Sequence, residues 1–168
     1  LSPRDAEPPP NTGPRHIGYH PTLPIVYFSN EQRLGLSVYR QSSSGSLELL
    51  QIADAVDENF DQEGTSSSDI VISQDGTHAF VGIRGHRKDF DRIARFALDA
   101  GTGKASFLGL TKADPIPWGM ALSPQGDYLL VTAANGATLA CYLISDQGDL
   151  SLAGKLAWDE KITDVETR

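Results

Sequence analysis

An all-β fold built from three similar units is predicted by two features of the sequence. The first is an internal repeat, in which a strand-like run, a short polar turn and a second strand-like run recur at intervals of 53 and then 50 residues. The second is that no window keeps a helical period, so little helix is expected. Periods of roughly 40 to 50 residues are typical of propellers, whose blades are four-stranded antiparallel sheets. The sequence therefore predicts a partial β-propeller of about three blades.

The three copies of the repeat align at His20, Ser73 and Ser123. Each copy is followed by two further strand-like runs, divided by a turn that contains glycine, and so completes a unit of four strands. These later runs cover residues 35–39 and 47–52, 92–98 and 105–110, and 138–144 and 150–156. The inner strands of the three blades are expected to begin near His16, Asp69 and Gly119.

The repeat also predicts how the chain is divided. The expected segments are a linker with the end of a preceding blade (1–14), a first blade (15–53), an inter-blade loop (54–68), a second blade (69–111), a third blade (112–157) and a closing strand or tail (158–168). Within the last segment, residues 162–165 have the pattern of a strand. Three blades cannot close a ring, so we expect either the remaining blades or another copy of the chain to complete it.

The composition narrows the classes of function. The formal net charge of −8 repels a phosphate backbone, so no nucleic-acid partner is expected. No apolar stretch approaches the roughly 18 residues of a membrane-spanning helix, and no membrane partner is expected. The N-terminus lacks the pattern of a secretory signal, which favours a cytoplasmic protein, although the chain begins at Leu1 and export stays open. Cys141 is expected to be a buried apolar residue.

The residues of the three units also resemble a known family. In the first unit the matching residues are Gly13-Pro14-Arg15-His16, His20-Pro21, Tyr27 and Asn30-Glu31. In the second they are Asp69-Ile70, Ser73, Asp75-Gly76 and Arg84-Gly85-His86, and in the third Pro117, Ser123-Pro124, Gly126 and Asn135. In order and spacing these motifs resemble the lactonase-type seven-bladed propellers, which include 6-phosphogluconolactonases and carboxy-muconate cyclases.

The resemblance implies a seven-bladed ring and an enzyme that acts on an acidic lactone. The chain departs from the family pattern at two positions, since Ile83 stands where an asparagine is usual and Trp118 where an arginine is expected. We therefore keep three functions open. The first is a 6-phosphogluconolactonase-like hydrolase that opens a sugar or sugar-acid lactone, the second is a catalytically silent propeller that binds a protein or a small ligand, and the third is a muconate-type cycloisomerase.

Antiparallel pairing brings charged residues of different strands to one end of the blades. A first turn centred at 22–23 sets Arg15 opposite Asn30 and brings Glu31 alongside. An equivalent turn in the second blade places Arg84 at the same end. Because the inner strands of a propeller begin beside its central channel, these charged side chains are expected to converge there.

Lactone hydrolysis needs a general base, groups that stabilise an oxyanion, and a proton donor. Glu31 is the predicted base, and Arg15 and Arg84 are predicted to stabilise the oxyanion and attract an acidic substrate. Protonation of the leaving ring oxygen is assigned to either His16 or His86. The predicted substrate-binding residues are Arg15, Arg84, Trp118 and Asn135. The expected ligand is therefore a small acidic lactone or a related sugar derivative.

Structural alternatives accompany several of these assignments. Arg15 and Glu31 are also suited to a simple interstrand salt bridge, and His86 begins a charged segment of the kind that is often solvated surface. Trp118 is also suited to filling space near the channel. His20 is expected to be a structural turn residue.

Two further features of the sequence are assigned no chemistry. The serine runs at 42–44 and 66–68 lack the motif of a nucleophile elbow and are expected to be loops. The four histidines show no spacing typical of metal ligands, so no metal and no other cofactor is expected.

Overall fold

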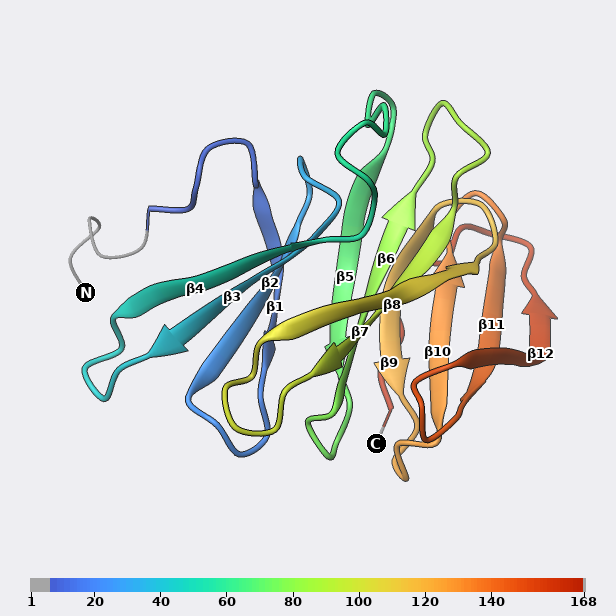
Figure 1. Cartoon of the computed structure of the whole chain (residues 1–168). Coiled ribbons are helices and arrows are strands. Elements are labelled where there is room, and N and C mark those ends of the chain that lie inside the picture. The colour runs from blue at the N-terminus through green and yellow to red at the C-terminus, as the bar shows by residue number, and fades with distance from the viewer. Residues whose placement is uncertain (1–6, 168) are drawn as a thin grey trace.

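The computed structural model describes residues 7–167, which form twelve strands and no helix. The first sheet contains β1 (Pro14–Tyr19), β2 (Ile25–Asn30), β3 (Gly35–Gln41) and β4 (Leu47–Asp54). The second contains β5 (Ser66–Ile72), β6 (His78–Arg84), β7 (Arg92–Leu98) and β8 (Ala105–Lys112). The third contains β9 (Pro117–Leu122), β10 (Tyr128–Ala133), β11 (Thr138–Ile144) and β12 (Leu150–Ala157). All neighbouring strands are antiparallel, which confirms the predicted blades (Figure 1).

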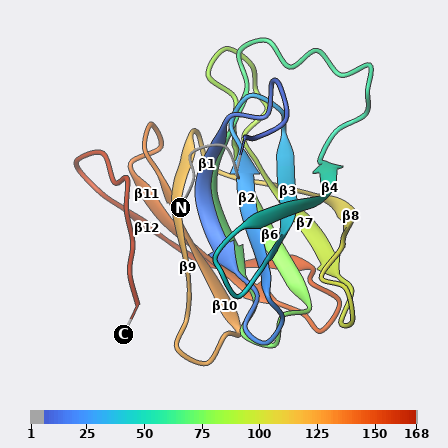
Figure 2. The same ribbon diagram turned by 90° about the vertical axis from the view of Figure 1, so that its left-hand side faces the viewer.

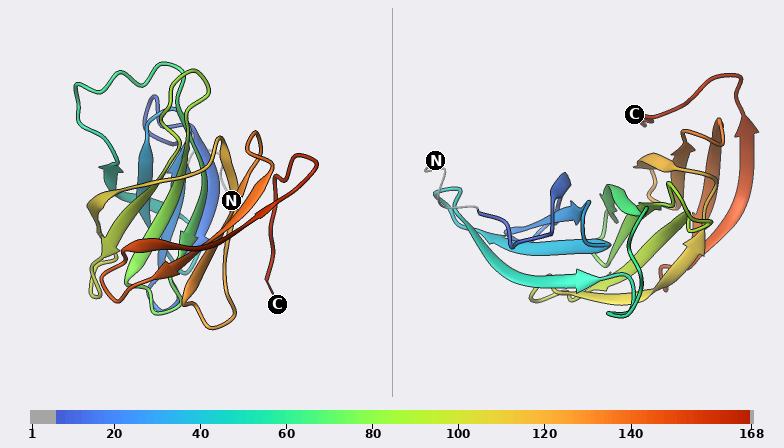
Figure 3. Two further views of the ribbon diagram at one scale, coloured as in Figure 1. Left: turned by 90° about the vertical axis from the view of Figure 1, so that its right-hand side faces the viewer. Right: turned by 90° about the horizontal axis from the view of Figure 1, so that it is seen from above.

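The three blades stand side by side in an open arc. Viewed from above, the inner strands β1, β5 and β9 lie on the concave side, and the outer strands β4 and β8 lie on the convex side (Figure 3). The side view in Figure 2 shows the strong twist that each sheet develops between its inner and outer strands. The arrangement is that of a partial propeller, as the repeat predicts. None of the described residues belongs to a helix that could cross a membrane.

The two faces of the middle blade pack against different neighbours. Because side chains alternate along a strand, Val81 and Ile83 of β6 face the first blade, whereas Phe80 faces the third. The core between the first and second blades includes the buried residues Tyr27, Leu36, Val38 and Phe96. The core between the second and third blades includes the buried residues Ile93, Leu129, Val131 and Tyr142. Ile83 therefore replaces the family's asparagine at a position of apolar packing.

The inner strand of every blade carries a β-bulge near its start. Ile17 pairs with Phe28 as the predicted turn requires, but it is Pro14 that pairs with Asn30. The prediction that Arg15 lies opposite Asn30 is therefore wrong by one residue. The same shift of register occurs in β5 and in β9. Bulges commonly turn a side chain towards a new direction beside a functional site, and here all three lie at one end of the arc.

Three local expectations need correction. The serines 66–68 are buried residues of strand β5 and not a loop. Residues 162–165 form no strand, and the segment after β12 instead runs back beside β9, where the Thr167 hydroxyl donates to the Leu122 carbonyl. Cys141 is only half-buried in β11.

The turn role expected of His20 is confirmed. Its Nδ1 accepts hydrogen bonds from the backbone N–H groups of Thr22 and Leu23, at 3.2 and 3.0 Å. Gly76 of the next blade packs against the edge of its ring. His20 therefore stabilises the end of the first blade that lies away from the bulges.

Gly35 offers a test of the blade geometry. Its φ of 138° is one that L side chains rarely adopt, and a Cβ added there would collide with the Ala53 carbonyl oxygen. We expect Gly35→Ala to lower the free energy of unfolding by about 1–3 kcal/mol, measured by urea titration of the far-UV circular dichroism. The control is Gly154→Ala, where a Cβ meets nothing within 4 Å. Equal stabilities of the two variants would contradict this description of the first blade.

Candidate functional site

Glu31 and two arginines meet at the end of the blades that carries the bulges. Glu31 directly follows β2, Arg84 ends β6, and Arg15 lies in the bulge of β1. Arg84 Nη2 donates to Glu31 Oε1 at 2.6 Å and to the Ser67 carbonyl oxygen at 2.9 Å. Arg15 Nε lies 3.8 Å from the same Glu31 oxygen. Side chains from two blades therefore form one charged cluster beside the inner strands.

The third blade contributes an aromatic ring to this cluster. The guanidinium carbons of Arg84 and Arg15 lie 4.7 and 5.3 Å from the centre of the Trp118 ring, which is within the range of cation–π attraction. Trp118 lies in the bulge of β9, at the position equivalent to Arg15 in β1. The bulges thus direct side chains from separate blades into the same space.

Burial distinguishes the members of the cluster. The Arg84 side chain is 3% exposed, whereas that of Glu31 is 46% exposed. Burial lowers the pKa of Arg84, and the hydrogen bond to Glu31 opposes that shift. The guanidinium nevertheless stays charged at neutral pH, because its ordinary pKa is so high. The cluster therefore combines a buried cation with a carboxylate that water can reach.

Two donors in the cluster lack partners. Within the described residues, Arg84 Nε and Arg15 Nη1 are buried and make no hydrogen bond. Buried polar groups of native proteins are usually paired, so such exceptions often indicate a site for a ligand or water. Both atoms belong to cations, and a ligand with an anionic oxygen is the partner that suits them best.

A buried carboxylate holds the two loops around the cluster together. Asp91 Oδ1 accepts hydrogen bonds from the Gly85 N–H at 2.9 Å and from the Ile116 N–H at 2.7 Å. Ile116 precedes β9 and has a φ of 61°, which is rare for a β-branched residue and is often found at functional sites. Asp91 therefore helps to set the position of Trp118 relative to Arg84.

His86 lies in the loop after Arg84 and contacts a serine. Its Nε2 is 2.9 Å from the Ser66 hydroxyl oxygen, and Ser66 pairs directly with Arg84 across the sheet. Partial burial, followed by the charge of Arg84, lowers the pKa of His86 below its ordinary value. His86 is therefore neutral at pH 7, which disfavours it as a proton donor.

The lowered pKa of His86 can be measured by an NMR titration of its ring. We expect a midpoint below 6.5, the ordinary value. Arg84→Met removes one cause of the shift and should move the midpoint upward. Because the unfolded chain binds more protons between the two pKa values, the free energy of unfolding should fall as the pH is lowered from 6.5 through the folded pKa. A midpoint at or above 6.5 would rule out this electrostatic description.

His16 and Asp69 form a second polar pair beside the first cluster. His16 Nδ1 lies 2.7 Å from Asp69 Oδ1, and Asp69 Oδ2 accepts a hydrogen bond from the Met120 N–H at 2.8 Å. The carboxylate thus links the inner strands of all three blades. The sequence motif of the second blade includes Asp69, but no pattern in the sequence indicates its partners on β1 and β9, or the contact of Ser66 with His86 in the loop after β6.

Asn135 is the predicted site residue with the weakest connection to the cluster. It is exposed in the turn after β10, and its side chain makes no hydrogen bond within residues 7–167. The backbone of that turn does contact the segment before Trp118, through the Ala134 N–H to Ile116 carbonyl bond at 2.9 Å. Asn135 therefore lies at the correct end of the third blade, and its role stays a prediction.

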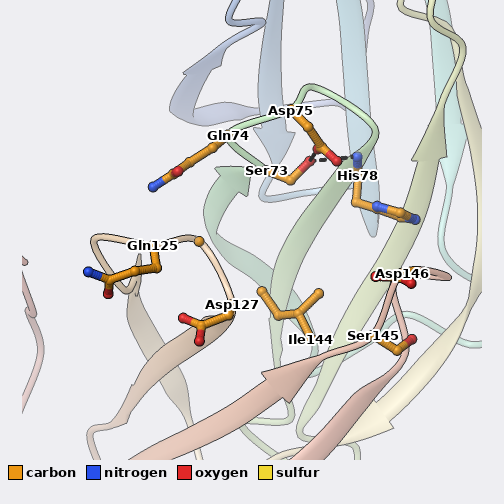
Figure 4. Close-up of a pocket in the computed structure, with 10 residues that line it drawn as sticks. Ser73, Gln74, Asp75, His78, Gln125, Asp127, Ile144, Ser145 and Asp146 are labelled. Atoms are coloured by element: carbon orange, nitrogen blue, oxygen red, sulfur yellow. Dashed lines mark hydrogen bonds between the residues drawn. The ribbon is translucent and has the colours of Figure 1, made fainter.

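The opposite end of the blades holds a separate cavity of about 340 Å³ (Figure 4). It lies between the hairpin turns of the second and third blades and is polar. Its lining residues include Ser73, Gln74, Asp75, His78, Asp127 and Asp146. No described group of three or more His, Cys, Asp or Glu residues is arranged to hold a metal ion, either here or elsewhere. This cavity contains none of the predicted site residues.

Solved structures share the fold of the chain. A candidate 6-phosphogluconolactonase from Bacteroides fragilis has a TM-score of 0.82 at 24% identity, over 93% of this chain and 42% of that one. The periplasmic gluconolactonase of Pseudomonas aeruginosa has a TM-score of 0.82 at 23% identity, over 93% and 43%. A candidate 6-phosphogluconolactonase from Bacteroides uniformis has a TM-score of 0.79 at 25% identity, over 90% and 42%. The chain thus spans less than half the length of these proteins.

A family model extends this likeness to the sequence. The model described as lactonase, 7-bladed beta-propeller, matches residues 2–165, which is nearly the whole chain. The match agrees with the three four-stranded blades of the structure. The chain therefore belongs to the seven-bladed β-propeller lactonase family.

Proposed function

We propose that this chain supplies three blades of a lactonase that opens a sugar or sugar-acid lactone, in the manner of a 6-phosphogluconolactonase. The observation that carries the proposal is that Arg15 and Arg84 contact both Glu31 and Trp118 at the inner end of the blades. An exposed carboxylate beside cations with unpartnered donors suits the hydrolysis of an acidic lactone.

The proposed reaction begins with the attack of water on the lactone carbonyl. The water oxygen forms a bond to the carbonyl carbon, and its proton passes to Glu31. Glu31 Oε1 is held by Arg84, so Oε2 is the oxygen that acts as the base. General-base catalysis of this kind typically contributes 10²- to 10⁴-fold to the rate.

The guanidinium groups stabilise the negative charge that develops on the carbonyl oxygen. Arg84 Nε and Arg15 Nη1 are the donors without other partners, and burial strengthens their interaction with an anion. The carbon–oxygen bond of the ring then breaks, its electron pair moves to the ring oxygen, and that oxygen takes a proton from a histidine. The same cations attract a substrate that carries a carboxylate or a phosphate.

A propeller that binds a ligand without reacting is the second candidate. Arg84 already has partners within the cluster, because it donates a hydrogen bond to Glu31 and lies over the ring of Trp118. Such mutual pairing is expected of a structural network. The two functions differ in a measurable way, because only the lactonase increases the rate of ring opening.

Hydrolysis by the intact protein tests the proposal. The substrates are 6-phosphogluconolactone, the uncharged glucono-lactone and an uncharged aliphatic lactone, each corrected for spontaneous opening. We expect the phosphorylated substrate to react with the highest kcat/KM, because it carries the charge that Arg15 and Arg84 attract. Binding of 6-phosphogluconate with no rate above background for any lactone would instead support the binding propeller.

The remaining blades of the ring are proposed as the structural partner of this chain. Large apolar side chains are exposed on β11, on β12 and just after β12, namely Leu143, Leu152, Leu156 and Trp158. A further blade, or another copy of the chain, would bury them. The cytoplasmic location favoured by the sequence also stays a prediction, since one structural neighbour is described as periplasmic.

A further inference from the structure

We infer that Asp69 positions His16 so that the Nε2 atom of His16 delivers the proton to the leaving ring oxygen. This inference rests on the proposed lactonase function and assigns the step that two histidines could perform. It also gives Asp69 a role in the reaction as a positioning residue on a neighbouring blade.

The hydrogen bonds of Asp69 determine which ring nitrogen of His16 carries a proton. Asp69 Oδ1 accepts from the Ile70 N–H at 2.8 Å, and Oδ2 accepts from the Met120 N–H at 2.8 Å. An ionised carboxylate can only accept hydrogen bonds. His16 Nδ1, which lies 2.7 Å from Oδ1, must therefore donate, and the neutral ring carries its proton on Nδ1.

Hydrogen bonds fix both partners of the contact, Asp69 and His16. The side chain of Asp69 is 15% exposed, and its two oxygens are tied to the backbones of β5 and β9. The backbone N–H of His16 donates to the Ser29 hydroxyl at 3.1 Å, and that hydroxyl donates to the Ser68 carbonyl at 2.7 Å. These hydrogen bonds fix both the carboxylate of Asp69 and the backbone of His16, and the pair joins neighbouring blades.

The free nitrogen of His16 is the one available for chemistry. The His16 side chain is 44% exposed, and its Nε2 makes no hydrogen bond within residues 7–167. His16 directly follows Arg15, and both lie in the bulge of β1. Nε2 therefore belongs to the same end of the blade as the Glu31 cluster.

His16 is better suited than His86 to donate the proton. His86 is neutral at pH 7, because burial and Arg84 lower its pKa, and its Nε2 contacts Ser66. By contrast, Asp69 holds the ring of His16 at Nδ1 and leaves its exposed Nε2 without a partner among the described residues. When His16 is protonated at both nitrogens, Nε2 gives its proton to the ring oxygen as the carbon–oxygen bond breaks. After the reaction His16 takes a proton from solvent, and Glu31 releases to solvent the proton that it took from the attacking water.

The test combines the tautomer of His16 with the kinetics of the intact protein. ¹⁵N NMR of the imidazole rings at high pH should show His16 protonated at Nδ1, and His16→Gln identifies its signals by their loss. In Asp69→Asn, an amide can point its NH₂ group at Nδ1, so the proton should move to Nε2. We expect kcat to fall by about 10²- to 10⁴-fold, with a much smaller change in KM.

The matched control is Asp75→Asn in the hairpin turn at the far end of the second blade. Asp75 also accepts several hydrogen bonds, from Ser73 and Thr77, but it does not contact His16. This variant should leave both the His16 spectrum and kcat unchanged.

Two results would overturn the inference. One is an unprotonated Nδ1 in the wild-type protein, a measurement that needs no variant and so does not depend on the folding of Asp69→Asn. The other is a folded Asp69→Asn variant with unchanged kcat. If the tautomer is as expected but no lactone is opened, the proposed lactonase function fails and the assigned proton donation fails with it, while the hydrogen bonding of Asp69 stands.

Discussion

Replacing Glu31 with Gln is expected to abolish lactone opening while leaving the blades folded. The amide has nearly the same shape as the carboxylate and can still accept a hydrogen bond from Arg84 Nη2, but it cannot take a proton from water. We expect kcat to fall by about 10²- to 10⁴-fold. The measurement is the initial rate of 6-phosphogluconolactone opening, corrected for the spontaneous reaction.

Glu48→Gln is the control for this substitution. Glu48 also pairs with an arginine, since Arg40 Nη1 lies 3.1 Å from its Oε2, but both side chains are exposed on the outer strands of the first blade. Exposed pairs of this kind contribute little to stability, and this pair does not contact the candidate site. If the Glu31→Gln variant and the wild-type protein opened the lactone at equal rates, Glu31 would be excluded as the base.

Replacing Arg84 with Met is expected to affect both the reaction and the fold. The variant loses the hydrogen bonds to Glu31 and to the Ser67 carbonyl as well as the stack on Trp118. We expect kcat/KM to fall by about 10²- to 10³-fold, as for the loss of one oxyanion donor. The free energy of unfolding should fall by about 1–3 kcal/mol, because the buried Ser67 carbonyl loses its hydrogen-bond donor. Glu31 is exposed, so water can replace the hydrogen bond that it loses.

Urea titration and steady-state kinetics separate these two effects of Arg84→Met. The control is Arg40→Met, which removes an exposed arginine and should change both quantities very little. A variant that lost stability but kept full kcat/KM would show that Arg84 is a structural residue only.

The repeat was sufficient to predict the three blades, because hairpin pairing is a local property. The turn in each hairpin sets the register of its two strands, and a turn centred at 22–23 requires the observed pairing of Ile17 with Phe28. It also placed Arg84 and Glu31 at the same end of their blades. The bulges were missed, since an inserted residue at the start of a strand leaves the alternation of the remaining residues intact.

Contacts between blades could not be predicted in the same way. Asp69 acquires its partner His16 on the neighbouring blade from a side-chain direction that the bulge determines. The position of Trp118 over two arginines depends in addition on how three separate sheets pack. Pairing within one sheet carries no information on these distances, so the sequence reasoning found the charged residues but not the hydrogen bonds that orient them.

The segment after β12 shows a related limit. The apolar residues Ile162 and Val165 and the β-branched Thr163 suggest a strand, yet this segment joins no sheet. A strand forms only where a neighbour offers free backbone groups. The residue types of a segment cannot indicate whether such a neighbour is present.

Fluorescence of Trp118 reports whether an acidic ligand enters the space between Arg15 and Arg84. The chain has two tryptophans, so a Trp158→Phe background leaves Trp118 as the only such fluorophore in this chain. Titration of this protein with 6-phosphogluconate, the acid formed from the phosphorylated lactone, should give a saturable change in emission. Arg84→Met in the same background should weaken the binding at least tenfold. A titration with no change in emission, or with equal affinity in the two proteins, would contradict the assignment of this cluster as the lactone site.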